Sequence, residues 1–314
     1  MHGDGHHDKE LRLGIHAGVV AYVVWGLLTI YWKQLTAFDA FELIAWRILG
    51  STVVMAAVVT VRRRWPVLRA AAADHRLVGR LGLAALLLTI NWTAYVWAVV
   101  HGRIIETALG YFMAPLGTML LGVTVLHERP RPLQRAALAC AVVAVVVLTV
   151  TYGRPPLVAL LIAGSWSLYG LLKRQVPLTA IESLAGETFL LTIPAAAVAV
   201  FLSGGSDSLP TTASGGQWIL IALTGVVTAV PLVLFAVAAQ RVPFTLLGPL
   251  QYLVPTINFL LGWFVYGESL PTDRFVGFVI VWIGLAATAI DQLHHSRASR
   301  GRGLVTGYSS RAAG

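Results

Sequence analysis

The stretch NWTAYVWAVVHGRIIETALGYFMAPLGTMLLGVTVLHER, from Asn91 to Arg129, decides the fold of this chain. It predicts two apolar helices joined by a short polar turn. Its pattern returns 140 residues later, in one register and without a gap. The pairs that match at this offset include Lys33 with Lys173, Glu42 with Glu182, Pro115 with Pro255, Gly122 with Gly262 and Glu128 with Glu268. Because chance rarely aligns two glutamate pairs, a lysine pair and a proline pair together, we infer an internal duplication.

The composition is typical of a membrane protein. Hydrophobic residues make up 57% of the chain and charged residues 12%, whereas soluble domains carry about 25% charge. The mean hydropathy is +0.76, and apolar runs long enough to cross a bilayer recur along the chain. The polar start, MHGDGHHDKE, lacks the apolar core of a cleaved signal, so the first apolar run is expected to be retained. Cys140 is the only cysteine, and we expect no disulfide, metal site or cofactor.

Ten apolar runs are predicted to cross the membrane as helices, because lipid offers no partner to an open strand edge. They are expected at Leu13–Trp32, Glu42–Val61, Gly79–Val100, Ile104–Leu126, Leu133–Thr151, Leu157–Leu172, Ile181–Leu202, Gln217–Ala238, Pro243–Tyr266 and Arg274–Ile290. Residues 1–12 and 292–314 are expected to be cytoplasmic tails, largely disordered. The loop at 203–216, rich in glycine and serine, is expected to be a flexible outer connector.

The basic residues predict how the spans are oriented. With the N-terminus inside, 18 lysines and arginines fall in inner segments and 4 in outer segments. Cytoplasmic loops carry such an excess, so both termini are predicted to be cytoplasmic. The net charge of +9 is then explained by short loops and does not indicate a nucleic-acid partner.

Each copy of the duplication holds five predicted spans, at residues 13–151 and 152–291. Because five is odd, the second copy must cross the membrane in the opposite direction to the first. Inverted repeats of this kind are found in secondary transporters, whose substrate site lies near mid-membrane at the repeat interface. The predicted fold class is therefore an all-α membrane protein of ten transmembrane helices in two inverted five-helix repeats.

One stripe of polar residues is present in each copy. In the fourth and ninth spans, a polar residue, a proline and a second polar residue stand at i, i+4 and i+7, on one helical face. They are Tyr111, Pro115 and Thr118 in the first copy and Gln251, Pro255 and Asn258 in the second. A proline leaves a backbone carbonyl free, which is tolerated where protein or a water-filled cavity takes it up. We expect both stripes to line a cavity, and packing of proline-kinked helices is the alternative.

The third span adds a second stripe. Asn91 and Tyr95 lie on one face of it, and Asn91 should face the bundle because an amide is costly in lipid. Trp92 and Tyr252 are aromatic residues that could stack on a planar or cationic substrate, although packing is the commoner role. Since few charged groups are expected around this cavity, a neutral or zwitterionic substrate is favoured.

Arg47 and Glu187 are charges within predicted spans, and they are repeat mates. A charge at the bilayer centre costs about 2.5–3.5 kcal/mol on insertion scales, so each needs a partner or access to water. Two alternatives stay open, namely pairing with each other near the midplane or snorkelling to the headgroups. Glu106 stands in the first turn of its span, where the helix dipole favours an acid, so stabilisation of that helix end is favoured over proton coupling.

Four segments resemble the RarD group, also called chloramphenicol-sensitive proteins, of the EamA-type drug/metabolite transporter superfamily. They are NWTAYVWAVVHGRIIETALGYFMAPL (Asn91–Leu116), WGLLTIYWK (Trp25–Lys33), GETFLLTIP (Gly186–Pro194) and LLGPLQYLVPT (Leu246–Thr256). The resemblance extends over about Leu13 to Ile290, with one departure at Ala114, where the group often has asparagine. It implies a ten-helix permease of the bacterial inner membrane, made of two inverted EamA repeats, and it names no substrate.

We therefore predict a secondary exporter of small organic metabolites or drug-like compounds that works by alternating access. Its expected partners are that substrate, the lipid bilayer and either a coupling proton or an exchanged substrate. A primary pump is disfavoured because the chain has no GxxxxGK[ST] phosphate loop. An intramembrane enzyme and a channel-like facilitator are the alternatives, but the sequence has neither an evident nucleophile–base set nor a filter-like stretch.

Overall fold

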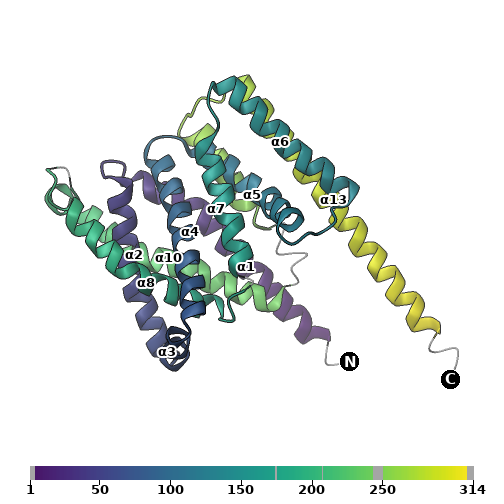
Figure 1. Cartoon of the computed structure of the whole chain (residues 1–314), viewed down its shortest axis with the longest axis horizontal. Coiled ribbons are helices and arrows are strands. Elements are labelled where there is room, and N and C mark those ends of the chain that lie inside the picture. Colours follow the sequence, from purple (N-terminus) through teal and green to yellow (C-terminus); the bar gives the residue numbers. More distant parts are fainter. Residues whose placement is uncertain (1–3, 174, 207, 243–249, 310–314) are drawn as a thin grey trace. The chain divides into compact units, whose positions relative to one another are not determined.

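The computed structural model describes residues 4–173, 175–206, 208–242 and 250–309, and every regular element in them is a helix (Figure 1). The elements are α1 (Asp4–Lys33), α2 (Ala40–Val61), α3 (Trp65–Ala73), α4 (His75–Val100), α5 (Ile104–Thr124), α6 (Pro132–Tyr152), α7 (Leu157–Lys173), α8 (Ala180–Leu202), α9 (Leu209–Thr212), α10 (Gly215–Arg241), α12 (Leu253–Leu260), the π-helix η1 (Leu261–Val265) and α13 (Thr272–Ser309). They fall into two compact units. Unit 1 is Met1–Thr118 with Leu157–Ser269, and unit 2 is Met119–Pro156 with Leu270–Gly314.

Eight of the described helices are long and apolar enough to cross a membrane. Two shorter apolar helices, Leu157–Lys173 and Leu253–Val265, lie where the sixth and ninth spans were predicted. The prediction of an all-α, multi-pass membrane protein is therefore confirmed, whereas the count of ten spans stays a prediction.

The ninth predicted span, Pro243–Tyr266, is not one helix in the described residues. Residues 243–249 lie outside that part of the chain, Gln251 and Tyr252 form a turn, and α12 begins only after them. Pro255 thus stands in the first turn of α12, where its missing N–H breaks no helical hydrogen bond. The helix kink predicted at Pro255 stays a prediction, because residues 243–249 lie outside the described part of the chain, whereas Pro115 lies inside α5.

The polar ends of the chain are helical where they are described. α1 begins at Asp4 and α13 runs to Ser309, through most of the residues for which disorder was predicted. No proline interrupts either run, so each N–H can bond the carbonyl four residues earlier.

The loop at 203–216 is tied to unit 1 by a buried carboxylate. Its short helix α9 starts at Leu209, whose N–H donates to both carboxylate oxygens of Glu42, at 3.0 and 3.1 Å. Glu42 is 2% exposed, so the loop is anchored to the start of α2 although its composition predicted a flexible connector.

Polar side chains cap the N-termini of four helices of unit 1, where the first N–H groups have no helical partner. The capping residues are Asp39 of α2, Asp74 of α4, Thr179 of α8 and Ser214 of α10. The N–H groups of Leu77 and Arg76 hold the pKa of the Asp74 carboxyl below its ordinary value. These caps explain why the observed helix starts lie within a few residues of the predicted ones.

The repeat mates α2 and α8 pack against each other in antiparallel fashion. Thr52 and Thr192, which are 140 residues apart, join their hydroxyls at 2.9 Å. Arg64, just beyond the end of α2, pairs with Glu182 in the first turn of α8. The pseudo-symmetry of the duplication therefore relates two helices that touch at equivalent residues.

Other contacts of unit 1 obey the same symmetry. A Cβ added to Gly26 of α1 would meet Ile257 of α12, and one added to Gly117 of α5 would meet Ser167 of α7. Ile257 is the mate of Gly117, and α7 is the mate of α1. α1 also packs along α10, as α4 packs along α7. Small residues thus let equivalent pairs of helices approach closely, as is usual in membranes.

Unit 2 is built on one pair of repeat mates, α6 and α13, which lie side by side (Figure 1). Gly277 of α13 leaves room for Leu148 of α6, and Gly284 for Ala137 and Cys140. The order of these contacts shows that the two helices are antiparallel. Arg131 pairs with Asp291 at 2.6 Å at one end of the helix pair.

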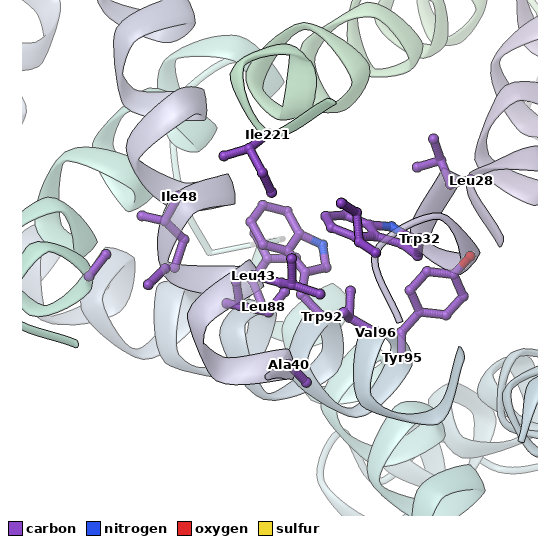
Figure 2. Packing of buried hydrophobic residues seen from close by; sticks show 14 of the residues in the cluster. Leu28, Trp32, Ala40, Leu43, Ile48, Leu88, Trp92, Tyr95, Val96 and Ile221 are labelled. Carbon is purple, nitrogen blue, oxygen red and sulfur yellow. The ribbon is translucent and has the colours of Figure 1, made fainter. Parts of the chain in front are cut away.

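The buried core of unit 1 is a cluster of aromatic and aliphatic side chains. It includes Leu28 and Trp32 of α1, Leu43 of α2, Trp92 of α4 and Ile221 of α10 (Figure 2). Because this cluster joins helices from both copies of the duplication, the polar residues that lie within it are held by both repeats.

Candidate functional site

Asn258 is the centre of a buried hydrogen-bond network that links four helices of unit 1. Its side chain on α12 is fully buried, and its Oδ1 accepts from Thr29 Oγ1 of α1 at 2.9 Å. The Thr29 hydroxyl also lies 2.9 Å from the Tyr95 hydroxyl of α4. Since Thr29 gives its only proton to Asn258, Tyr95 is the donor in that second bond. The Asn258 amide is 3.4 Å from Thr107 of α5.

A second network is centred on Asn91 of α4, which is 1% exposed. Its Oδ1 accepts from the Tyr111 hydroxyl of α5 at 3.1 Å. Its Nδ2 donates to the Ile162 carbonyl and to Ser165 Oγ of α7, both at 3.1 Å. The rings of Tyr95 and Tyr111 are 6.0 Å apart, so the two networks adjoin. Four predicted site residues, Asn91, Tyr95, Tyr111 and Asn258, are therefore brought together.

Three other predicted site residues have different surroundings. Thr118 is exposed, and its hydroxyl bonds the Ala114 carbonyl of its own helix at 3.1 Å. Tyr252 stacks on Phe112 with ring centroids 6.5 Å apart. Gln251 is half-buried in the turn before α12. The i, i+4, i+7 spacing assumed a continuous helix, and the turn at 251–252 breaks that assumption in the second copy.

Arg47 of α2 lies inside unit 1 with 5% of its surface exposed. Its Nε donates to Thr228 Oγ1 of α10 at 3.1 Å. The guanidinium lies over the ring of Trp92 of α4 at 4.0 Å and over that of Trp32 of α1 at 5.5 Å. The predicted residue Trp92 is thus in the site, as a cation–π partner of Arg47.

Glu187 of α8 is fully buried and has partners of its own. Its carboxylate accepts from Lys173 Nζ at 2.7 Å, from Ser183 Oγ at 2.8 Å and from the Tyr169 hydroxyl at 3.1 Å. Arg47 and Glu187 therefore neither pair with each other nor reach out of the protein, which were the two predicted alternatives. Their neighbours differ because Lys173 pairs with Glu187, whereas its repeat mate Lys33 lies over the ring of Tyr266 and Arg47 lies over that of Trp92.

Glu268 fixes the N-terminus of α5, which carries Tyr111. Its two carboxylate oxygens accept the N–H groups of Ile104 and Ile105 at 2.6 and 2.8 Å. Burial raises the pKa of Glu268 above its ordinary value, and these two N–H groups oppose that shift. The predicted residue Glu106 is half-buried in the same first turn, so Glu268 supplies the negative charge that directly caps this helix end.

Sequence reasoning missed Thr29, Trp32, Lys173 and Thr228 as members of these clusters. Thr29 and Thr228 lie within apolar runs, and hydropathy alone does not distinguish them from threonines that only bond their own helix. Thr228 also makes such a bond, to the Thr224 carbonyl at 2.8 Å. Lys173 was recognised only as a repeat match. Within the described residues, no group of three histidine, cysteine, aspartate or glutamate side chains is placed to hold a metal ion.

Comparisons with known proteins match almost the whole chain. The EamA-like transporter family matches twice, over residues 12–150 and 154–290. Protein RarD of Streptomyces exfoliatus is 39% identical over 295 residues, which is 94% of each chain. The uncharacterized transporter YojE of Bacillus subtilis is 38% identical over 93% of this chain and 98% of its own. A crystal structure of a protein with 21% sequence identity matches with a TM-score of 0.55, over 88% of this chain and 97% of that one, and it shares the fold.

Proposed function

The chain belongs to the EamA-like transporter family, and from this premise we propose that it is a secondary-active transporter of small organic metabolites or drug-like compounds. The resemblance to the RarD group is confirmed by relatives of that name. Other relatives are named as transporters, and they support the prediction that this chain is a membrane transporter. The substrate class and the mechanism are our proposal.

The observation that carries the proposal is the set of buried polar side chains inside an apolar bundle. Asn91 and Tyr95, which are buried, and Tyr111, which is half-buried, come from the first copy of the duplication, and the buried Asn258 comes from the second. Substrate sites of repeat-built transporters lie between the copies, and ligand sites are mostly apolar with a few placed polar groups. In our proposal, relative motion of the two copies opens this site to one side of the membrane at a time.

The proposed architecture is ten spans in two inverted repeats, in the bacterial inner membrane, with both termini cytoplasmic. The antiparallel packing of α2 with α8, and of α6 with α13, supports it. If both members of such a pair cross the bilayer, they cross it in opposite directions. The bias of 18 basic residues to 4 between alternate segments supports the orientation.

The orientation predicts which engineered thiols are accessible in intact cells. In a Cys140→Ala background, a cysteine at Ser206 should react with a membrane-impermeant maleimide from outside. A cysteine at Ala70 should react only after the cells are opened. Both positions are exposed in the structure, so burial does not protect either of them. The reverse labelling pattern would refute the proposed orientation.

The transport proposal predicts a selective loss of function in two variants. Asn258→Leu and Tyr111→Phe each remove a hydrogen-bonding group from the networks, and each should weaken substrate binding on the order of tenfold. The measurement is counterflow in proteoliposomes, first screened over metabolites and drugs with the wild-type protein. Cys140→Ala, in α6 of unit 2, is the matched control and should leave transport unchanged.

The outcomes separate three classes of function. Saturable counterflow supports a carrier, whereas flux that rises linearly with substrate concentration would indicate a channel. Chemical conversion of an added lipid or peptide would indicate an enzyme. Normal kinetics in well-folded Asn258→Leu and Tyr111→Phe proteins would remove the networks from the substrate site. Melting temperatures of the variants in detergent show whether each of them is folded.

A further inference from the structure

Arg47 is a buried cation whose two terminal nitrogens make no hydrogen bond within the described residues. Its only hydrogen bond within the described residues runs from Nε to the neutral hydroxyl of Thr228. The ion pairs of that part of the chain do not include it. The two terminal nitrogens, which carry four N–H groups, therefore have no protein acceptor there. Burying a charge in this way is costly unless a counter-ion is supplied.

A second donor beside it is also unused. Trp32 is 1% exposed, and its indole Nε1 has no hydrogen-bond partner among the residues that the structure describes. The guanidinium carbon lies 5.5 Å from the centre of this ring and 4.0 Å from that of Trp92. The cation therefore lies over the faces of both indole rings. A guanidinium in a cation–π contact can still donate hydrogen bonds from its N–H groups to an acceptor.

The repeat mate of Arg47 shows the contrast. Glu187 occupies the equivalent position and accepts three hydrogen bonds, one of them from a lysine. The buried charge in the second copy therefore has a counter-ion, whereas the described part of the chain supplies none to the charge in the first copy. A buried charge without a protein counter-ion is typical of a ligand-binding site, because residues that bind a ligand are not optimised for the stability of the protein.

We propose that Arg47 and Trp32 form the carboxylate-binding subsite of the transport site, and that the substrate is a small organic monocarboxylate. This inference rests on the proposed function and gives it a substrate class. A carboxylate matches the guanidinium fork with two parallel hydrogen bonds, and the Trp32 N–H donates a third. One unpaired cation balances one negative charge, so a monoanion fits better than a dianion such as phosphate.

The surroundings indicate what the rest of the substrate looks like. Leu43, Leu88, Val96 and Ile221 belong to the same buried cluster as Trp32 and Trp92 (Figure 2). The body of the carboxylate is therefore apolar or aromatic. The hydroxyl and amide network at Tyr95 offers hydrogen bonds to a further polar group, such as the ammonium of a zwitterion. Compounds that are purely cationic are excluded by the charge of Arg47.

Binding of matched acids and amides tests the proposal. Four labelled carboxylates (acetate, isobutyrate, phenylacetate and indole-3-acetate) and their neutral amides are compared by equilibrium dialysis against the purified protein in detergent. At least one acid with an apolar body should bind, with an affinity on the order of 100-fold above that of its amide. Wild-type protein that binds no acid better than its amide overturns the proposal.

Three variants test which residues cause the preference for the acid over its amide. Arg47→Gln should abolish it, Arg47→Lys should reduce it about tenfold because lysine lacks the bidentate fork, and Trp32→Phe should reduce it about fivefold because it removes one donor. Trp46→Phe is the matched control, and it should leave the preference unchanged. Trp46 precedes Arg47 on α2 and its Nε1 also has no partner within the described residues, but its ring contacts Trp218. Arg47→Gln should melt no lower than wild type, because it removes a charge without a counter-ion.

A lower melting temperature of Arg47→Gln with an intact preference for the acid would assign Arg47 a structural role and overturn the subsite. Failure of the proposed function gives a different result. Carboxylate binding that depends on Arg47, without saturable flux in proteoliposomes, would keep the subsite and refute the transporter. Saturable flux of neutral compounds by a protein that does not bind carboxylates would support the transporter and refute the subsite.

Discussion

Replacing Lys173 by methionine is expected to lower the free energy of unfolding by about 3–5 kcal/mol, the usual cost of removing one partner of a buried ion pair. Glu187 is fully buried, and Lys173 Nζ lies 2.7 Å from its carboxylate. Without the lysine, the carboxylate either stays charged without a counter-ion or takes up a proton at a cost in free energy. Unfolding in mixed micelles measures the change.

The partner and the repeat mate provide the controls. Glu187→Gln should cost less, because the Lys173 side chain is 23% exposed and can turn toward water. The double variant with methionine at both positions should be more stable than Lys173→Met alone, since it leaves no buried charge. Lys33→Met, at the equivalent position of the first copy, should cost below about 1 kcal/mol, because Lys33 makes a cation–π contact with Tyr266 at 5.1 Å. Equal effects of Lys33→Met and Lys173→Met would contradict this account.

Replacing Gly225 by alanine is expected to destabilise the protein by about 3 kcal/mol, the upper end of the usual cost of overpacking. A Cβ on Gly225 of α10 would clash with the carbonyl oxygen of Gly50 in α2 and would lie 2.5 Å from the carbonyl carbon of that residue. These are backbone atoms, so no side-chain rotation relieves the clash and the two helices must separate. Melting in detergent should show the loss directly.

The same substitution should also disturb the candidate site. Thr228, which holds Arg47 Nε at 3.1 Å, follows Gly225 by three residues on α10. Moving α10 away from α2 therefore pulls Thr228 from Arg47, and binding of the carboxylate probe should weaken together with stability. Gly164→Ala is the control, since a Cβ there meets nothing within 4 Å. That change should be neutral or stabilise the protein by up to about 1 kcal/mol, as alanine favours helix. A Gly225→Ala protein as stable as wild type would show that the helices separate at little cost.

Much of the fold could be predicted from the sequence because hydropathy and capping are local properties. Apolar runs long enough for a bilayer led to helices such as α2 and α8, whose ends agree with the predictions within two residues. Asp39 and Thr179 cap those helices by bonds to residues only two or three positions away. The one-register duplication made α2 and α8 repeat mates, and the structure shows that these two helices touch at the equivalent residues Thr52 and Thr192.

Helical spacing also predicted part of the candidate site, including Asn91 and Asn258. An amide within an apolar span must find partners inside the bundle, and both Asn91 and Asn258 do so. Their partners could not be predicted, because the hydroxyl of Thr29 lies 229 residues from Asn258 in the chain and 2.9 Å from it in space. The turn at 251–252 also broke the spacing rule for Gln251, since the rule holds only along an uninterrupted helix.

The sequence by itself determined that this is an all-α membrane protein built from a duplicated unit, and it identified the charges within the spans. Only the tertiary structure decided what those charges do. Arg47 and Glu187 occupy equivalent positions, yet Glu187 meets Lys173, whereas Arg47 meets two indole rings and one hydroxyl. The physical reason is that the energy of a buried charge depends on the few groups within hydrogen-bond range, and the packing of different helices selects those groups.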